Sequence, residues 1–159
     1  MKFILSYLIA ISTFIFATLA TWYEGSTIID DPWEWNYSAD FTRLGNEENI
    51  TSSSQISQLD HFIYAAKFKP TFPVLMVLSF TFILMMTAYL LTKRRPKMKI
   101  LFHVLLGSVL LFIGFLIQDS PTLGGKLFTW FFILCSSANI ILVLILLGKS
   151  RRRKFAKVS

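Results

Sequence analysis

The chain has 159 residues, of which 54% are hydrophobic and 16% are charged, and its formal net charge is +7. Its mean hydropathy is +0.58, whereas a soluble domain of this length carries about 25% charged residues. The apolar residues fall in long blocks, so the composition excludes a soluble globule, a disordered tail and a disulfide-stapled secreted domain. The sequence predicts an integral membrane protein.

Four apolar blocks have roughly the 20-residue length with which a helix crosses about 30 Å of hydrocarbon. None of the blocks contains Asp, Glu, Lys or Arg. Because they are continuously apolar rather than alternating, they indicate helices and not the strands of a barrel. The predicted fold is all-α, a single four-transmembrane-helix bundle with spans at residues 3–23, 72–91, 100–117 and 127–147.

The first block has a second interpretation. Lys2, the apolar run and the small residues at 18–20 also fit a signal peptide with a cleavage site. The run is longer than the usual h-region of about 7–15 residues, and Trp22 and Tyr23 follow it as an interfacial anchor does. An uncleaved first helix is the favoured prediction.

Basic residues are unevenly distributed between the two ends of the predicted bundle. Twelve of the 16 lie before the first span, between the second and third, or after the fourth, and all nine acidic residues lie on the other side. The positive-inside rule then places both termini, residues 93–99 and the basic tail 148–159 in the cytoplasm, with the protein in the cell membrane. The basic ends are expected to attract anionic lipid. Nucleic acid is not an expected partner, because no groove-reading or aromatic element accompanies these charges.

The outward-facing loop, residues 24–69, carries an alternating run of aromatic residues. Trp33, Trp35 and Tyr37 share one face if the chain is extended, and the Asp-Asp-Pro sequence at 30–32 indicates a turn. We therefore expect a short strand or hairpin here. Its aromatic side chains either pack against the bundle and the headgroup zone or form a recognition surface for a protein or cell-wall ligand.

The rest of this loop predicts a polar, flexible connection at 43–54 and then a helix. Ser52 and Gln55 fit a capping box that opens this helix. The helix is expected to be amphipathic and to lie on the outer membrane surface. Its apolar face holds Ile56, Leu59, Phe62, Ile63 and Ala66, and its polar side holds Asp60, His61 and Lys67.

Polar residues are rare within the spans. Ser136, Ser137 and Asn139 lie near the middle of the fourth, where they are expected to make interhelical contacts. Their alternative role is to line the path of a small oligomeric channel or transporter. His103 is expected at the cytoplasmic interface, and Cys135 as an inert buried thiol.

The chain has no nucleophile motif, zinc-ligand spacing or phosphate-binding loop, and no cofactor is expected. In the pairs Asp60–His61 and Asp30–Asp31, adjacent side chains project in different directions, so an enzyme acting on lipid or wall precursor is a minor alternative. Binding of a hard cation by Asp30, Asp31 and Glu34 is another. The leading prediction is a non-enzymatic envelope interaction or accessory protein that acts through its outer loop, with a membrane or envelope protein or a second copy as partner.

Three segments carry a resemblance to a known family: residues 22–26 (WYEGS), 32–35 (PWEW) and 65–70 (AAKFKP). Here the chain resembles small, uncharacterised four-helix membrane proteins of Gram-positive spore-forming bacteria, a domain-of-unknown-function family. The resemblance implies a location in the membrane and no particular activity. The layout is also similar to that of claudin-type proteins, although the paired cysteines of the claudin outer loop are missing, so this likeness is architectural only.

Overall fold

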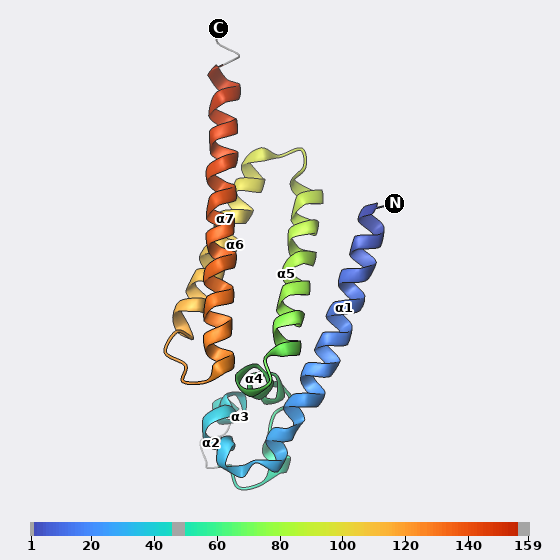
Figure 1. The fold of residues 1–159 in the computed structure, drawn as a ribbon, viewed down its shortest axis with the longest axis vertical. Helices are drawn as coiled ribbons and strands as arrows, with labels where there is room; N and C mark the ends of the chain where they lie inside the picture. The colour runs from blue at the N-terminus through green and yellow to red at the C-terminus, as the bar shows by residue number, and fades with distance from the viewer. Residues whose placement is uncertain (1, 46–49, 156–159) are drawn as a thin grey trace. The chain divides into compact units, whose positions relative to one another are not determined.

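The computed structural model describes residues 2–45 and 50–155, and throughout these ranges the chain is helical or connects one helix to the next. Figure 1 labels helices α1 to α7, and η denotes a 3-10 helix in the text. In chain order they are α1 (Lys2–Gly25), η1 (Ser26–Asp30), η2 (Pro32–Glu34), α2 (Trp35–Ser38), α3 (Asp40–Gly45), η3 (Ser53–Gln55), α4 (Gln58–Phe68), α5 (Thr71–Thr92), α6 (Pro96–Leu116) and α7 (Leu123–Phe155).

Four of these helices, α1, α5, α6 and α7, are long and apolar enough to cross a membrane. Each corresponds to one predicted apolar span, and only Ile117, the C-cap residue of α6, falls outside. Large apolar side chains such as Ile4 and Leu144 are more than 60% exposed along these helices. Helix α7 continues past the predicted end of its span, into the basic tail.

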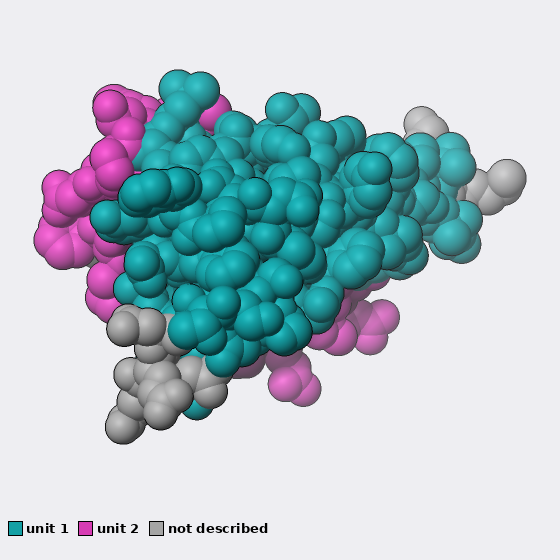
Figure 2. Space-filling model, turned by 90° about the horizontal axis from the view of Figure 1, so that it is seen from below, with its two compact units in different colours: residues 1–84, 122–125 teal, residues 85–121, 126–159 magenta. Residues whose placement is uncertain are grey.

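The chain divides into two compact units, coloured separately in Figure 2. Unit 1 comprises residues 1–84 and 122–125, and unit 2 comprises residues 85–121 and 126–159. In unit 1 the rings of Phe14 and Phe80 join α1 to α5, with centroids 5.7 Å apart. In unit 2 a Cβ atom added at Gly107 of α6 would lie 3.2 Å from the Cβ of Asn139 on α7. This small residue lets α6 and α7 approach closely.

The predicted strand or hairpin is wrong. Within residues 2–45 and 50–155 there is no strand, and the aromatic run lies in η2 and α2. Pro32 occupies the first turn of η2, where its fixed φ favours a helical start. The amides of Glu34 and Ala39 then bond back to the carbonyls of Asp31 and Trp35. An alternation of three aromatic residues is too short to separate the period of a strand from that of a helix.

The segment before α4 also differs from expectation. The capping box of Ser52 and Gln55 is present, but it opens η3. Helix α4 begins three residues later, and the Ser57 hydroxyl caps it by accepting the amide N–H of Leu59. Of the predicted loop at 43–54, the first three residues belong to α3, and residues 46–49 lie outside the described part of the chain.

The burial of this segment does not follow the two predicted faces. Asp60 and His61 of the predicted polar side are buried, and so is Ile56 of the predicted apolar face, whereas Leu59 of that face is 51% exposed. The hydrogen bonds described below are the reason, because they supply the buried carboxylate with donors.

Candidate functional site

The candidate site is a helical cap, defined here as the described residues 26–45 and 50–70 between α1 and α5. Its apolar core consists of Ile28, Ala39 and Ile56, all buried, with Trp35, Ile50 and Tyr64 packed against them. The indole N–H of Trp35 donates to the carbonyl oxygen of Ile28 at 2.8 Å. The described part of the cap, which has no cysteine, is thus held together by a small apolar core in which the indole N–H of Trp35 has a hydrogen-bond acceptor.

The three aromatic residues of the predicted surface have different environments. Trp33 is 85% exposed and Tyr37 is 71% exposed, whereas Trp35 is partly buried against the core. The backbone from 32 to 38 is continuously right-handed and helical, so the side chains of Trp33 and Tyr37, four residues apart, lie on the same side. Two of the three residues therefore form an outward-facing pair, and the third anchors the segment beneath them.

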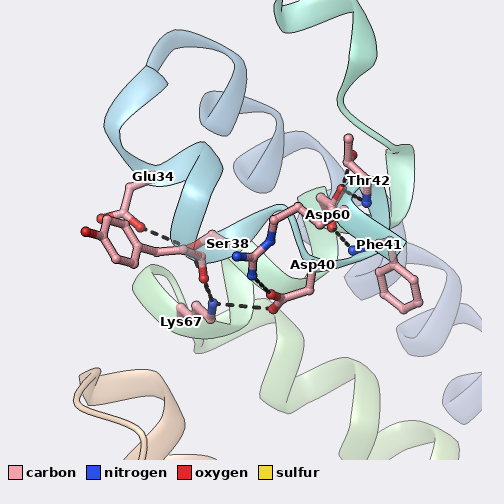
Figure 3. Close-up of polar contacts among 9 residues, drawn as sticks. Glu34, Ser38, Asp40, Phe41, Thr42, Asp60 and Lys67 are labelled. Atoms are coloured by element: carbon pink, nitrogen blue, oxygen red, sulfur yellow. Dashed lines mark hydrogen bonds and ion pairs between the residues drawn. The ribbon is translucent and has the colours of Figure 1, made fainter. Parts of the chain in front are cut away.

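Asp60 of α4 caps the N-terminus of α3 (Figure 3). Its carboxylate accepts the amide N–H of Phe41 at 2.8 Å and that of Thr42 at 3.0 Å, and it accepts the Thr42 hydroxyl at 2.6 Å. The same hydroxyl oxygen accepts the amide N–H of Ser57 at 2.8 Å. A fully buried carboxylate with three donors at a helix N-terminus is well stabilised, so this residue has a structural role.

Lys67 of α4 links the same helix to α2. Its ammonium donates to the carbonyl oxygen of Tyr37 and, at 3.4 Å, to the hydroxyl of Ser38, and it lies 3.7 Å from a carboxylate oxygen of Asp40 (Figure 3). The Ser38 hydroxyl donates to the carboxylate of Glu34 at 3.0 Å. Helix α4 therefore fixes the base of the segment that carries the exposed aromatic pair.

Helix α4 also packs directly on α1. A Cβ atom added at Gly25 would overlap the backbone carbonyl oxygen of His61, so only glycine permits this approach. Beside this contact, the indole N–H of Trp22 donates to the side-chain oxygen of Gln58 at 2.7 Å, and the Trp22 and His61 rings lie with centroids 5.8 Å apart.

The imidazole of His61 is 1% exposed, and neither of its nitrogens has a hydrogen-bond partner among the described residues. Burial lowers the pKa of His61 below its ordinary value of 6.5, and the negative charge of Asp60 raises it by a smaller amount. The two side chains share no hydrogen bond in the described structure, and the Asp60 carboxylate is occupied by α3. They therefore do not form an acid–base pair.

Three acidic residues of the cap, Asp30, Asp31 and Glu34, lie within seven positions of Tyr37 in the chain. Burial, followed by the negative charge of Asp31, raises the pKa of Tyr64; a hydrogen bond with the Thr27 side chain lowers it, and Glu34 raises it further. Asp31 and Glu34 thus reinforce one another's field at this side of the cap. Among the residues that the structure describes, no cluster of three His, Cys, Asp or Glu residues is suited to a metal ion.

In unit 2, Ser136 and Asn139 contact another helix, whereas Ser137 does not. The Oδ1 of Asn139 accepts a hydrogen bond from the Nδ1 of His103 at 2.9 Å, and its side-chain N–H donates to the Cys135 carbonyl at 2.8 Å. The Ser136 hydroxyl donates to the Gly107 carbonyl at 2.8 Å. Ser137 is exposed and donates within its own helix to the carbonyl of residue 133. Ser136 and Asn139 join α7 to α6, and His103 is buried at this contact.

These features define a class of all-helical protein. In it, a compact helical cap joins two long apolar helices, and two further apolar helices follow. The chain belongs to the family described as Domain of unknown function (DUF4306), whose model matches residues 4–92. It is similar to the uncharacterized protein YjdJ of Bacillus subtilis (strain 168), with 42% identity over 76 residues that cover 47% of this chain and 70% of that protein. No solved structure matches.

The family match confirms the expected resemblance to an uncharacterised family, although it does not support the four-helix or claudin-like layout. The match ends at residue 92, which is also the last residue of α5. The part shared with the family therefore consists of α1, the cap and α5. Trp33, Trp35 and Tyr37 lie inside it, whereas Ser136, Ser137 and Asn139 lie outside.

Proposed function

We propose that the protein crosses the cell membrane four times, with the cap on the outer side and both termini in the cytoplasm. The four apolar helices and the concentration of Lys and Arg at one end of them support this arrangement. The basic segments after α5 and in α7 would then lie against the inner leaflet, where anionic lipid favours them.

Labelling of introduced cysteines tests this orientation in a Cys135→Ala background. Leu44→Cys places a thiol at an 84% exposed position of the cap, and Lys97→Cys places one near the start of α6. We expect a membrane-impermeant maleimide to label the first in intact cells and the second only after permeabilisation. Labelling in the reverse order contradicts the proposed orientation.

We further propose that the protein is a non-enzymatic interaction or accessory protein of the cell envelope, and that the cap binds a partner through Trp33 and Tyr37. The observation that carries this proposal is the exposure of these two large aromatic side chains on a base that Trp35 and Lys67 hold in place. Aromatic residues exposed on a fixed support are typical centres of protein interfaces.

A photo-crosslinking residue at position 36, between the two aromatics, tests the proposal in native membranes. We expect a defined crosslinked protein with the wild-type surface and its loss in Trp33→Ala/Tyr37→Ala. Trp130→Ala, which removes a 66% exposed tryptophan of α7, is the matched control and should leave the crosslink unchanged. Retention of the crosslink in the double variant rules out these side chains as the contact.

A further inference from the structure

The exposed surface of η2 and α2 has an unusual combination of side chains. Trp33 and Tyr37 form what we call the aromatic face, and the structure places no described side chain over it, since the two are 85% and 71% exposed. Asp30 and Asp31 precede Trp33 in the chain, and Glu34 follows it directly. Three carboxylates therefore accompany two open aromatic rings.

These carboxylates make no direct ion pair in the part of the chain that the structure describes, and Lys67 reaches Glu34 only through the Ser38 hydroxyl. None of the three is within ion-pair distance of a basic side chain there, because the two ion pairs found, those of Arg43 and Lys67, are both made with Asp40. The Ser38 hydroxyl is a neutral donor to Glu34. Lys69 points to the backbone and hydroxyl oxygens of Glu24 and Thr27 at 3.5 Å.

The field of two of these carboxylates is directed into the same region. Asp31 and Glu34 both raise the pKa of the Tyr64 phenol, which packs against the core, so both charges act on this group. Such a field repels an anionic membrane surface and attracts cations, while an exposed indole or phenol ring adds attraction for an ammonium or guanidinium group.

We propose that the partner of the aromatic face is a positively charged protein segment, whose Lys or Arg side chains lie over the rings of Trp33 and Tyr37 and pair with Asp30, Asp31 and Glu34. This inference rests on the proposed function and specifies the chemistry of its partner. Charge complementarity selects the partner and speeds its association, and the rings supply the contact area.

The test uses the full chain in nanodiscs of zwitterionic lipid, so that anionic lipid does not compete. The probe is a fluorescent peptide in which Lys alternates with Gly and Ser, together with a counterpart in which Glu replaces every Lys. Anisotropy gives the dissociation constant of each. We expect the Lys peptide to bind at least about tenfold more tightly than the Glu peptide and to weaken as salt rises from about 50 to 300 mM.

Two sets of variants separate the contributions of charge and rings. Asp30→Asn/Asp31→Asn/Glu34→Gln preserves the shape of each side chain and an acceptor for Ser38, and should weaken Lys-peptide binding about tenfold or more. Trp33→Leu/Tyr37→Leu keeps the charges and should weaken it about threefold to tenfold. Asp119→Asn and Trp130→Leu remove an exposed acid and an exposed tryptophan elsewhere, and neither should change the binding.

Several results would overturn the inference. Equal binding of both peptides, or an unchanged affinity in the leucine variant, contradicts the combined role of rings and charge. Binding of the wild-type cap to anionic vesicles in preference to the Lys peptide identifies a membrane-docking surface instead. If the native crosslink is lost in Trp33→Ala/Tyr37→Ala but persists in the charge-neutralised protein, the interaction function stands and only the cationic partner is wrong.

Discussion

The hydroxyl of Thr42 and the carboxylate of Asp60 lie 2.6 Å apart across 18 positions of sequence. The same carboxylate also accepts the amide N–H groups of Phe41 and Thr42. A side chain of α4 therefore supplies the hydrogen-bond acceptors for the N-terminus of α3. A residue on the predicted polar side of an amphipathic helix is thus the buried junction of the cap.

Asp60→Ala should lower the free energy of opening the cap by about 3 kcal/mol, because three donors, two of them backbone amides, lose a charged acceptor. Asp60→Asn keeps an acceptor oxygen and should lose about 1–2 kcal/mol. Hydrogen exchange at the amides of Phe41 and Thr42 measures the change. Unaltered protection of these amides in the alanine variant contradicts the capping role.

Gly25→Ala should separate α1 from α4, since the new Cβ atom overlaps the His61 carbonyl oxygen, a backbone atom that cannot rotate away. We expect a loss of about 3 kcal/mol in cap stability and faster proteolysis of the cap. Gly45→Ala is the matched control: nothing lies within 4 Å of its added Cβ atom, so its effect should stay within about 1 kcal/mol. Equal behaviour of the two variants excludes a close approach at Gly25.

The buried imidazole of His61 predicts that the cap loses stability in acid. Its folded-state pKa is below the ordinary 6.5, so the open cap takes up a proton at a higher pH than the closed one. The contribution of the neutral His61 imidazole to the stability of the closed cap is therefore fully present above about pH 6.5. It declines as the pH falls from there towards the lowered pKa, by at most about 1.4 kcal/mol per pH unit. Hydrogen exchange of the cap as a function of pH measures this decline.

His61→Phe, which keeps a ring beside Trp22, isolates the imidazole contribution. Other charged groups lie near His61. They include Glu24, Asp30 and Asp40 on the elements packed against α4, and Asp60 and Lys67 on α4 itself. All of them are present in both the wild-type protein and the His61→Phe variant. The difference between the two pH profiles therefore reports His61 alone. Parallel profiles between about pH 7.5 and pH 5 would show that this imidazole does not titrate with opening.

Asn139→Ala should reduce the stability of unit 2 by about 1 kcal/mol, because it removes the partner of His103 between α6 and α7. Hydrogen bonds between membrane helices average about 0.6 kcal/mol and reach about 1.7. Ser137→Ala breaks only a bond within α7 and should have no measurable effect. Thermal unfolding in detergent compares the two, and identical midpoints would argue against an interhelical role of Asn139.

The long helices and part of the cap could be predicted from the sequence because each follows from a local pattern. Continuous apolar blocks specify α1, α5, α6 and α7 without reference to the rest of the chain, and the capping box of Ser52 and Gln55 is likewise a short-range signal. Ser136 and Asn139 of the fourth apolar block make their hydrogen bonds to Gly107 and His103 of α6.

The remaining features depend on contacts between distant residues. Asp60 is buried only because α3 presents its first amides to it from 18 and 19 positions away, and periodicity alone assigned it to the solvent side. Trp35 and Tyr37 alternate in sequence, yet the carbonyl of Ile28 holds the first inward while the second faces out. Such long-range partners have no signature in a single sequence.

The order of synthesis gives the Asp60 junction a further consequence. Residues 41 and 42 leave the ribosome 18–19 residues before the carboxylate that completes their helix, and a six-residue helix is too short to persist by itself. The N-terminus of α3 is therefore capped only after α4 has been synthesised. A nascent chain arrested before residue 60 exposes the same aromatic side chains without the surface that arranges them.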